Sequence, residues 1–354
     1  MEVKFAPKRC ARVNPDLVRV FSFVRTNSDC NLSSALANWF NAHRTYKFVI
    51  MMEFFSQHFA WMLEPTVLAR QTLAGVSNGM LLFLISAGLS LIFGVQRILN
   101  FAHGVLFMLG AFVAVSLSAQ WGESGAMFAW VLLAATVVLA LVGGLIEWGL
   151  LRRIYNAPHE FQLLITFALV FIMGDIVKLI WGNEDRSMTA PQALSGAAQT
   201  LGITFPNYRL FLIFTGVVVA VALWVLLHKT RWGIFIRAAT NDRAMLGALG
   251  VNTRWLYTSV FALGSALSGL GGALAAPVVS VGPGLHVQII IDAFVVVVIG
   301  GMGSVMGALV ASLLVGVINA YGVLAFPGWS VVMTFVCMAV VLIVRPWGLF
   351  GSPE

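Results

Sequence analysis

The chain has 354 residues, of which 60% are hydrophobic and 10% charged, with a net charge of +7 and a mean hydropathy of +0.92. Since about a quarter of the residues of a soluble protein are charged, this composition excludes an ordinary soluble protein and indicates an integral membrane protein. Residues 1–50 hold eight Lys or Arg against three Asp or Glu, so they carry +5 of the charge and the remainder carries +2. A nucleic-acid-binding role is therefore excluded for the body of the chain.

The first fifty residues contain neither a membrane span nor a secretory signal, because arginines interrupt every apolar run. Met51 or Met52 begins a segment typical of a short lead-in to a first span. We therefore interpret residues 1–50 as an upstream mis-start or a disordered extension; the alternative is a basic surface arm that binds anionic lipid. The chain is accordingly divided into an N-terminal extension, residues 1–70, and a transmembrane domain, residues 71–351.

Apolar stretches of spanning length follow the extension, and the last of them is interrupted twice, near residues 300–304 and 326–328. Each stretch is long enough for a helix to cross a hydrocarbon core about 30 Å thick. They predict an all-α fold, a polytopic transmembrane helical bundle with about eight or nine hydrophobic segments, some of them broken or re-entrant. The stretches are residues 72–95, 101–119, 126–151, 161–181, 210–227, 256–276 and 289–344.

The link between the first two predicted spans carries the sequence NFAHG, with Asn100, His103 and Gly104. Unwound backbone within a membrane must be buried in protein or line a cavity, because lipid offers no hydrogen bonds. These residues are candidates for a helix break or a transport pathway. We place the motif near the cytoplasmic interface and favour a structural or gating role over direct contact with a transported molecule; the alternative is that His103 only caps a helix.

A second predicted break has the sequence GGMGS and supplies Gly300, Gly301 and Gly303 as further candidates for a pathway or helix break. Repeated broken segments in two halves of a chain are one way in which transporters build a central pathway. The alternative is that these glycines only allow membrane helices to pack closely.

The segment 228–255 holds five Lys or Arg and one acid between spans without charge. Together with the links near residues 96–100 and 152–160 and the tail from Arg345, it gives one side of the membrane nine basic residues. Outside residues 1–50, the other side has three, Arg70, Arg186 and Arg209. The positive-inside rule then places segment 228–255, these two links and the C-terminus in the cytoplasm. The segment is also typical of an amphipathic helix, which makes it a candidate docking surface for a soluble partner. The apolar positions of this helix are Ile234, Ala238, Met245, Leu246 and Leu249.

Few other ionisable side chains fall within the predicted spans. Asp175 and Lys178 are three residues apart and are expected to form a pair on one helical face. Glu147 is expected to pair at the interface with the arginines one turn later, Arg152 and Arg153. Asp292 begins a long apolar run, where its carboxylate is expected to anchor a helix N-terminus.

No catalytic residue and no metal ligand is predicted from the sequence. Cys10, Cys30 and Cys337 have neither a disulfide pattern nor metal-ligand spacing. There is no nucleotide-binding loop and no constellation of catalytic side chains. If ATP drives this protein, the hydrolysis must therefore take place on another chain.

Five separated motifs together resemble one protein family. They are NFAHG, RWGIFIRAATNDRAMLGALGVN, ALSGLGGALAAP, DAFVVVVIGGMGSVMGALVASLLVGV and RPWGLFG, in this order between residues 72 and 351. This pattern resembles the permease subunits of bacterial ABC importers for branched-chain amino acids, a family that also contains urea and short-chain amide importers. The resemblance implies that residues 71–351 form a permease domain in the bacterial inner membrane.

The resemblance further implies a second homologous permease subunit, two cytoplasmic ATPase subunits that bind ATP and Mg, and a periplasmic substrate-binding protein. The permease itself would hold no cofactor and would not be an enzyme. Residues 233–252 would contain the coupling helix, although of the EAA pattern of other importers only Ala244 and Gly250 have a match. The implied coupling residues are Gly233, Arg237, Ala238, Arg243, Ala244, Gly250 and Asn252.

Two alternatives to a branched-chain amino acid importer stay open. One is a urea or amide importer of the same family, since the binding protein sets much of the specificity. The other is a self-sufficient channel or ion-coupled carrier, which would be expected to keep ionisable groups near the membrane midplane. Because such groups are few here, the second alternative is disfavoured.

Overall fold

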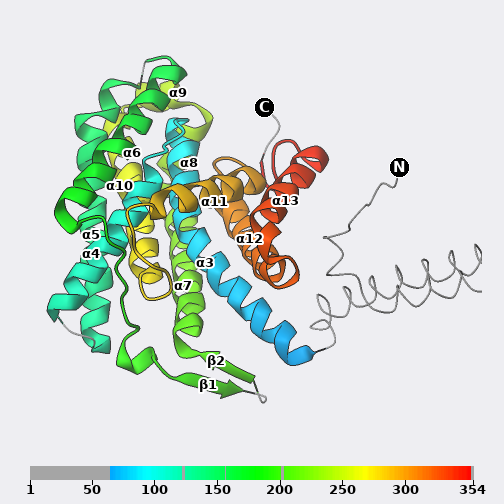
Figure 1. The fold of residues 1–354 in the computed structure, drawn as a ribbon. Coiled ribbons are helices and arrows are strands. Elements are labelled where there is room, and N and C mark those ends of the chain that lie inside the picture. The colour runs from blue at the N-terminus through cyan, green and yellow to red at the C-terminus, as the bar shows by residue number, and fades with distance from the viewer. Residues whose placement is uncertain (1–63, 122–123, 156, 201–202, 352–354) are drawn as a thin grey trace, which may run out of the picture. The chain divides into compact units, whose positions relative to one another are not determined.

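The computed structural model describes residues 64–121, 124–155, 157–200 and 203–351. The interpretation of residues 1–50 therefore lies outside the described residues. Within them, eleven α-helices and one two-stranded hairpin follow one another (Figure 1). The helices are α3 (Pro65–Gln96), α4 (His103–Trp121), α5 (Gly125–Gly149), α6 (His159–Trp181), α7 (Asn207–Lys229), α8 (Arg231–Asn241), α9 (Arg243–Ala248), α10 (Thr253–Ala275), α11 (Leu285–Gly300), α12 (Val305–Ala325) and α13 (Ser330–Val344).

Three short 3-10 turns and the antiparallel hairpin occupy the links. The turns are η2 (Leu151–Arg153), η3 (Gln192–Leu194) and η4 (Pro327–Trp329). Strands β1 (Ala197–Thr200) and β2 (Ile203–Pro206) pair with Ala197 opposite Pro206.

The predicted all-α transmembrane bundle is confirmed. Seven described helices are long and apolar enough to cross a membrane, and α11 and α13 are shorter apolar helices. Both predicted interruptions of the last apolar stretch are also confirmed, since α11 ends at Gly300, α12 begins at Val305 and η4 separates α12 from α13. The chain is therefore a multi-pass membrane protein.

Helix α3 is the centre of the packing. It has 32 residues and is about 48 Å long. Of its most apolar 18-residue stretch, 83% is buried inside the bundle, whereas the corresponding share for α6 is 17%. Small residues let its neighbours approach: a Cβ atom added to Gly75 would lie 2.8 Å from the Cα of Val317 on α12, and one on Gly88 would lie 2.6 Å from the Gly264 carbonyl oxygen on α10. Such close backbone contact is typical of helix packing in membranes.

Helices α5, α6 and α7 form the periphery of the described bundle. Large apolar side chains along them are more than half exposed, including Leu141 on α5, Phe171 on α6 and Phe214 on α7. An apolar surface of this extent on three successive helices fits contact with lipid tails.

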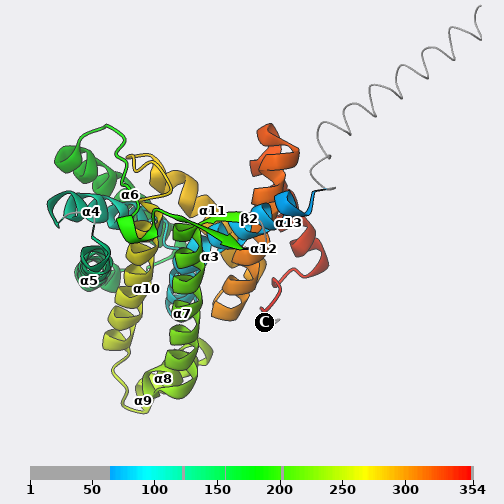
Figure 2. The same cartoon turned by 90° about the horizontal axis from the view of Figure 1, so that it is seen from below.

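The links that were predicted to share one side of the membrane do gather at one end of the bundle. Leu91 and Val95 at the end of α3 pack with Leu227, Ile236 and other side chains in one apolar cluster that Tyr155 also contacts. Figure 2 shows α8 and α9 at the ends of α7 and α10. That this end faces the cytoplasm stays a prediction.

The opposite end carries the hairpin and two of the basic residues assigned to the other side. Arg70 donates a hydrogen bond to Thr204 Oγ1 in β2 at 3.1 Å, and Arg186 forms an isolated antiparallel bridge with Val281.

Two predictions about ionisable residues have different outcomes. Lys178 Nζ lies 3.0 Å from Asp175 Oδ1, so the expected pair on α6 is confirmed. The prediction that Asp292 anchors a helix N-terminus is wrong, because α11 begins seven residues earlier, at Leu285. The apolar run extends to both sides of Asp292, so the carboxylate is in the interior of the helix.

Candidate functional site: a coupling segment, two helix breaks and a cavity

The coupling segment, residues 228–255, is attached to α7 by a tight corner. Thr230 caps α8, and its hydroxyl accepts a hydrogen bond from the Gly233 amide at 3.1 Å. Gly233 leaves no room for a side chain, because an added Cβ would lie 2.2 Å from the Leu227 carbonyl oxygen. The Arg237 guanidinium donates a hydrogen bond to the same carbonyl, so α8 is held against the last turn of α7 by both backbone and side chain.

A break at Asp242 divides the coupling segment into two short helices, so the prediction of one amphipathic helix is wrong. Asp242 accepts a hydrogen bond from the Met245 amide at 3.0 Å and so begins a new turn, α9. Gly250 has a φ of 83°, which favours glycine, and Asn252 accepts from the Trp255 amide at 3.3 Å to cap α10. Arg243 and Ala244 belong to α9, but their side chains lie outside what the structure describes.

The apolar side chains of the coupling segment divide between two faces. Ile236, Ala239 and Leu246 are buried in the cluster at the end of the bundle. Of the predicted apolar face, Ile234, Met245 and Leu249 are instead 54%, 60% and 74% exposed, whereas Ala238 is half-buried and Leu246 is buried. The exposed members leave an apolar surface on α8 and α9 that no other part of the described chain covers.

The first helix break, residues 97–102, turns the chain back into the bundle. Arg97 has a φ of 55° at the end of α3, and His103 at the start of α4 is fully buried. His103 Nε2 donates to the carbonyl oxygen of Ile85 at 3.1 Å, eleven residues before the end of α3, which is about 16 Å along that helix. His103 therefore lies deep in the core of the bundle, and the position of the motif relative to the membrane interface stays a prediction.

Buried hydrogen bonds hold this first break. The Asn100 side-chain oxygen accepts from the Ala102 amide at 3.2 Å, and the His103 carbonyl accepts from Ser268 Oγ of α10 at 3.0 Å. Gly104 lies directly against α11, where an added Cβ would be 2.7 Å from the His286 carbonyl oxygen. Asn100 Nδ2 and His103 Nδ1 are buried and find no partner among the described residues.

Glycine conformation and the C-terminal tail hold the second helix break, residues 301–304. Gly301 and Gly303 have φ angles of 99° and 87°, in the region that L side chains rarely adopt. The amides of Leu349 and Phe350 donate to the last carbonyls of α11, on Ile299 at 2.8 Å and Gly300 at 3.0 Å. The terminal motif RPWGLFG thus supplies hydrogen bonds that the end of α11 would otherwise lack.

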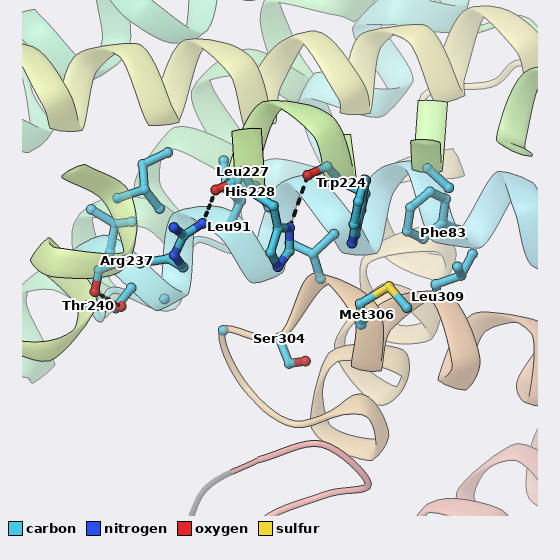
Figure 3. Close-up of a pocket in the computed structure, with 16 residues that line it drawn as sticks. Phe83, Leu91, Trp224, Leu227, His228, Arg237, Thr240, Ser304, Met306 and Leu309 are labelled. Atoms are coloured by element: carbon cyan, nitrogen blue, oxygen red, sulfur yellow. Dashed lines mark hydrogen bonds between the residues drawn. The ribbon is translucent and has the colours of Figure 1, made fainter. Parts of the chain in front are cut away.

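A cavity of about 340 Å³ separates the coupling segment from the second break (Figure 3). Arg237 and Thr240 of α8 line it on one side, and Gly303 and Ser304 line it on the other. The structure therefore brings one predicted coupling residue close to one predicted pathway residue. Asn100 and His103 are not among the residues that line this cavity.

Comparison with known proteins assigns the chain to a family. The family described as "Branched-chain amino acid transport system / permease component" matches residues 71–342. The chain belongs to this permease family. No solved structure matches it.

Three relatives of this permease span most of its length. The high-affinity branched-chain amino acid transport system permease protein LivH of Escherichia coli strain K12 is 26% identical over 309 residues, 84% of this chain and 98% of LivH. The corresponding protein BraD of Pseudomonas aeruginosa is 26% identical over 295 residues, 80% of this chain and 96% of BraD. A probable LivH of Methanocaldococcus jannaschii is 24% identical over 287 residues, 77% of this chain and 89% of that protein.

Sequence reasoning missed one polar cluster of the permease. Glu147 is fully buried and accepts hydrogen bonds from the hydroxyl groups of Tyr155 and Thr258, so its expected pairing with Arg152 and Arg153 is wrong. Burial and the hydrogen bond to Glu147 raise the pKa of Tyr155, which keeps its hydroxyl proton available for donation. Thr258 is 111 residues from Glu147, and nothing in the local sequence could have indicated this contact.

Proposed function

We propose that this chain is the membrane-spanning permease subunit of an ATP-driven importer that carries branched-chain amino acids across the bacterial inner membrane. The family match over residues 71–342 carries the proposal. The relatives described above, which span most of the chain, are named for branched-chain amino acids, so a urea or amide importer is not favoured. The same match disfavours a self-sufficient channel or ion-coupled carrier.

In this proposal the chain performs no chemistry and holds no cofactor. Two ATPase subunits bind ATP and Mg, a second homologous permease completes the membrane part, and a periplasmic binding protein delivers the amino acid. Segment 228–255 and the C-terminus face the cytoplasm, in accord with the nine basic residues grouped at that end. The hairpin end then faces the binding protein.

The exposed apolar side chains of α8 and α9 are the proposed contact with an ATPase subunit. Ile234, Met245 and Leu249 would enter a groove of that subunit, because an uncovered apolar surface at the aqueous end of a membrane protein is typical of a protein interface. Arg237 is turned back toward Leu227, so among the predicted coupling residues it is better placed to transmit a movement than to bind the ATPase.

Coupling would follow from the rigid attachment of α8. Its buried face packs on Leu91 and Val95 of α3, and its first turn is fixed to α7. A displacement of α8 by closure of the ATPase pair therefore has to shift the ends of α3 and α7. Such a shift favours one of two arrangements of the helices, inward-open or outward-open, through differential contacts.

The test combines co-purification with uptake. We expect Met245→Asp with Leu249→Asp to abolish co-purification of the ATPase without loss of membrane insertion, because both side chains are exposed. Gln192→Asp with Gln199→Asp adds the same charge to exposed positions at the other end and is the matched control. Retention of the ATPase by the first variant would contradict the coupling surface.

Uptake identifies the transported molecule. A strain that lacks this chain should regain uptake of labelled leucine when the chain is restored with its natural partners. Uptake of labelled urea but not leucine would contradict the amino acid assignment. Leucine uptake that persists after the ATPase is removed would contradict an ATP-driven importer.

A further inference from the structure

The cavity between α3, α7, α8 and the start of α12 has an apolar interior. Phe83, Leu91 and Val95 of α3 are each less than 5% exposed and form its inner wall. Leu309 of α12 and Ala220 of α7 extend this wall along the bundle. A volume of about 340 Å³ is within the range of roughly 300 to 1,000 Å³ found for small-molecule sites.

Basic side chains line one side of the cavity, at α7 and α8. Arg237 and His228 are exposed and line the cavity, and Lys229 and Arg231 follow in the same short connection. No Asp or Glu is among the residues that line it. An amino acid zwitterion needs partners for its carboxylate and for its ammonium group, so this lining suits an anion better than a transported amino acid.

The mouth also opens onto the peripheral surface of the bundle. Trp224 of α7 and Met306 of α12 line the cavity and are 44% and 49% exposed. Figure 3 shows Trp224 and His228 projecting from α7 on the side that faces Met306 and Ser304. The Trp224 and His228 rings stack at 5.3 Å, and Lys229 Nζ lies 5.9 Å from the Trp224 ring. An aromatic ring beside basic side chains at the end of a membrane helix is typical of the headgroup region.

We propose that an anionic phospholipid binds in this cavity, a role that goes beyond the proposed transport function. The phosphate lies at Arg237 and His228, and the upper part of one acyl chain enters between Phe83 and Leu309. Arg237 spends one donor on the Leu227 carbonyl, and a guanidinium has five, so donors are left for the phosphate. A bound lipid would thus contact the same side chain that attaches α8 to α7.

The test uses the complete transporter complex in nanodiscs with phospholipids that carry bromine on the acyl chain, which quenches tryptophan fluorescence. Brominated phosphatidylglycerol is compared with brominated phosphatidylcholine. We expect additional quenching by the anionic lipid, and Trp224→Phe should remove this addition. Trp148→Phe is the matched control: Trp148 is 63% exposed near the end of α5, and its removal should lower quenching by both lipids equally.

Charge variants then separate a built site from general attraction to basic surface. Arg237→Gln should raise the half-saturating fraction of phosphatidylglycerol about five-fold, which corresponds to about 1 kcal/mol for one basic residue near a membrane. Arg254→Gln removes an exposed arginine of the same segment that does not line the cavity, and it should have no effect. If Arg237→Gln fails to assemble into the complex, Met306→Phe is used in its place. It narrows the mouth of the cavity without changing the charge, and it should weaken binding of phosphatidylglycerol.

Three results would overturn the proposal. They are equal quenching by the two lipids in the wild-type complex, loss of the additional quenching in Arg254→Gln to the same extent as in Arg237→Gln, and additional quenching that survives Trp224→Phe. The first would also be the result if a partner subunit filled the cavity. None of them bears on leucine uptake or on the ATPase, so failure of this proposal is distinguishable from failure of the proposed function.

Discussion

The two helix breaks of this permease interrupt apolar segments by different means. The first, residues 97–102, leads into a fully buried His103 whose side chain reaches Ile85 in the middle of α3. The second, residues 301–304, has glycines at φ angles near 90° and is held by backbone hydrogen bonds from the tail to Ile299 and Gly300. Only the second break lines the cavity beside the coupling segment.

This difference indicates different roles for the two breaks. Side-chain hydrogen bonds inside a packed core cannot be exchanged for water, so movement of the first break would leave buried polar groups unsatisfied. The second break lies beside a cavity, and its backbone bonds can be replaced by water at the end of the bundle. We therefore expect the first break to determine stability and the second to move during transport.

The largest effect is expected at the first break. His103→Ala removes the hydrogen bond to Ile85 and leaves a void among α3, α4 and α10, so it should lower the free energy of unfolding by about 3 kcal/mol. Thermal unfolding of the detergent-solubilised protein measures this. Gln288→Ala, which truncates an exposed polar side chain on α11, is the control. Equal unfolding temperatures for the two variants would contradict a core role for His103.

A smaller effect is expected from a methyl group at the second break. Gly301→Ala forces a Cβ into a conformation with φ of 99°, and that atom would lie 2.5 Å from the Gly351 amide nitrogen. We expect a local cost of about 2 kcal/mol and faster hydrogen exchange at the amides of Leu349 and Phe350. Gly284→Ala is the matched control, because its φ is −88° and no atom lies near the added Cβ. Unchanged exchange at both amides would show that the tail does not depend on this glycine.

Removal of the C-terminal tail, which begins after Arg345, tests the hydrogen bonds that this tail donates to the end of α11 at the second break. A chain that ends after Arg345 lacks the Leu349 and Phe350 donors, and we expect a loss of about 1 kcal/mol, since water can take over part of the bonding. Hydrogen exchange at the Gly301 and Ser304 amides should become faster. Exchange at the His103 amide should not change; an increase there as well would mean that the two breaks are not independent.

Much of this architecture was predictable from the sequence, because its signals are local. Apolar stretches with few charges located the nine apolar helices of the described residues, and the glycines of GGMGS located the end of α11. The depth of His103 was not predictable, since a cluster of polar and small residues indicates a break but not whether the chain then turns back into the bundle. A hydrogen bond across 18 residues, to Ile85, decides this.

The same limit explains the errors in the coupling segment and at Glu147. Helical spacing alone placed Ile234, Met245 and Leu249 on one face, but the break at Asp242 and the packing on α3 decide which side chains are covered. The nearest basic residues in sequence suggested an ion pair for Glu147. Its partners are hydroxyl groups instead, and Thr258 reaches it only because α5 and α10 pack together.

The smallest effect is expected from Thr166→Val, which separates the contributions within the first break. Thr166 Oγ1 reaches the Leu99 carbonyl only at 3.4 Å and also bonds the Leu163 carbonyl at 2.9 Å, so its loss from the break should cost about 0.5 kcal/mol. Valine preserves the shape of the side chain, and a thermal unfolding curve close to that of wild type is the expected result. Thr166→Val could instead lower the unfolding temperature as much as His103→Ala does. The first break would then be held by all of its polar contacts together, and the buried position of His103 alone would not account for the stability of the break.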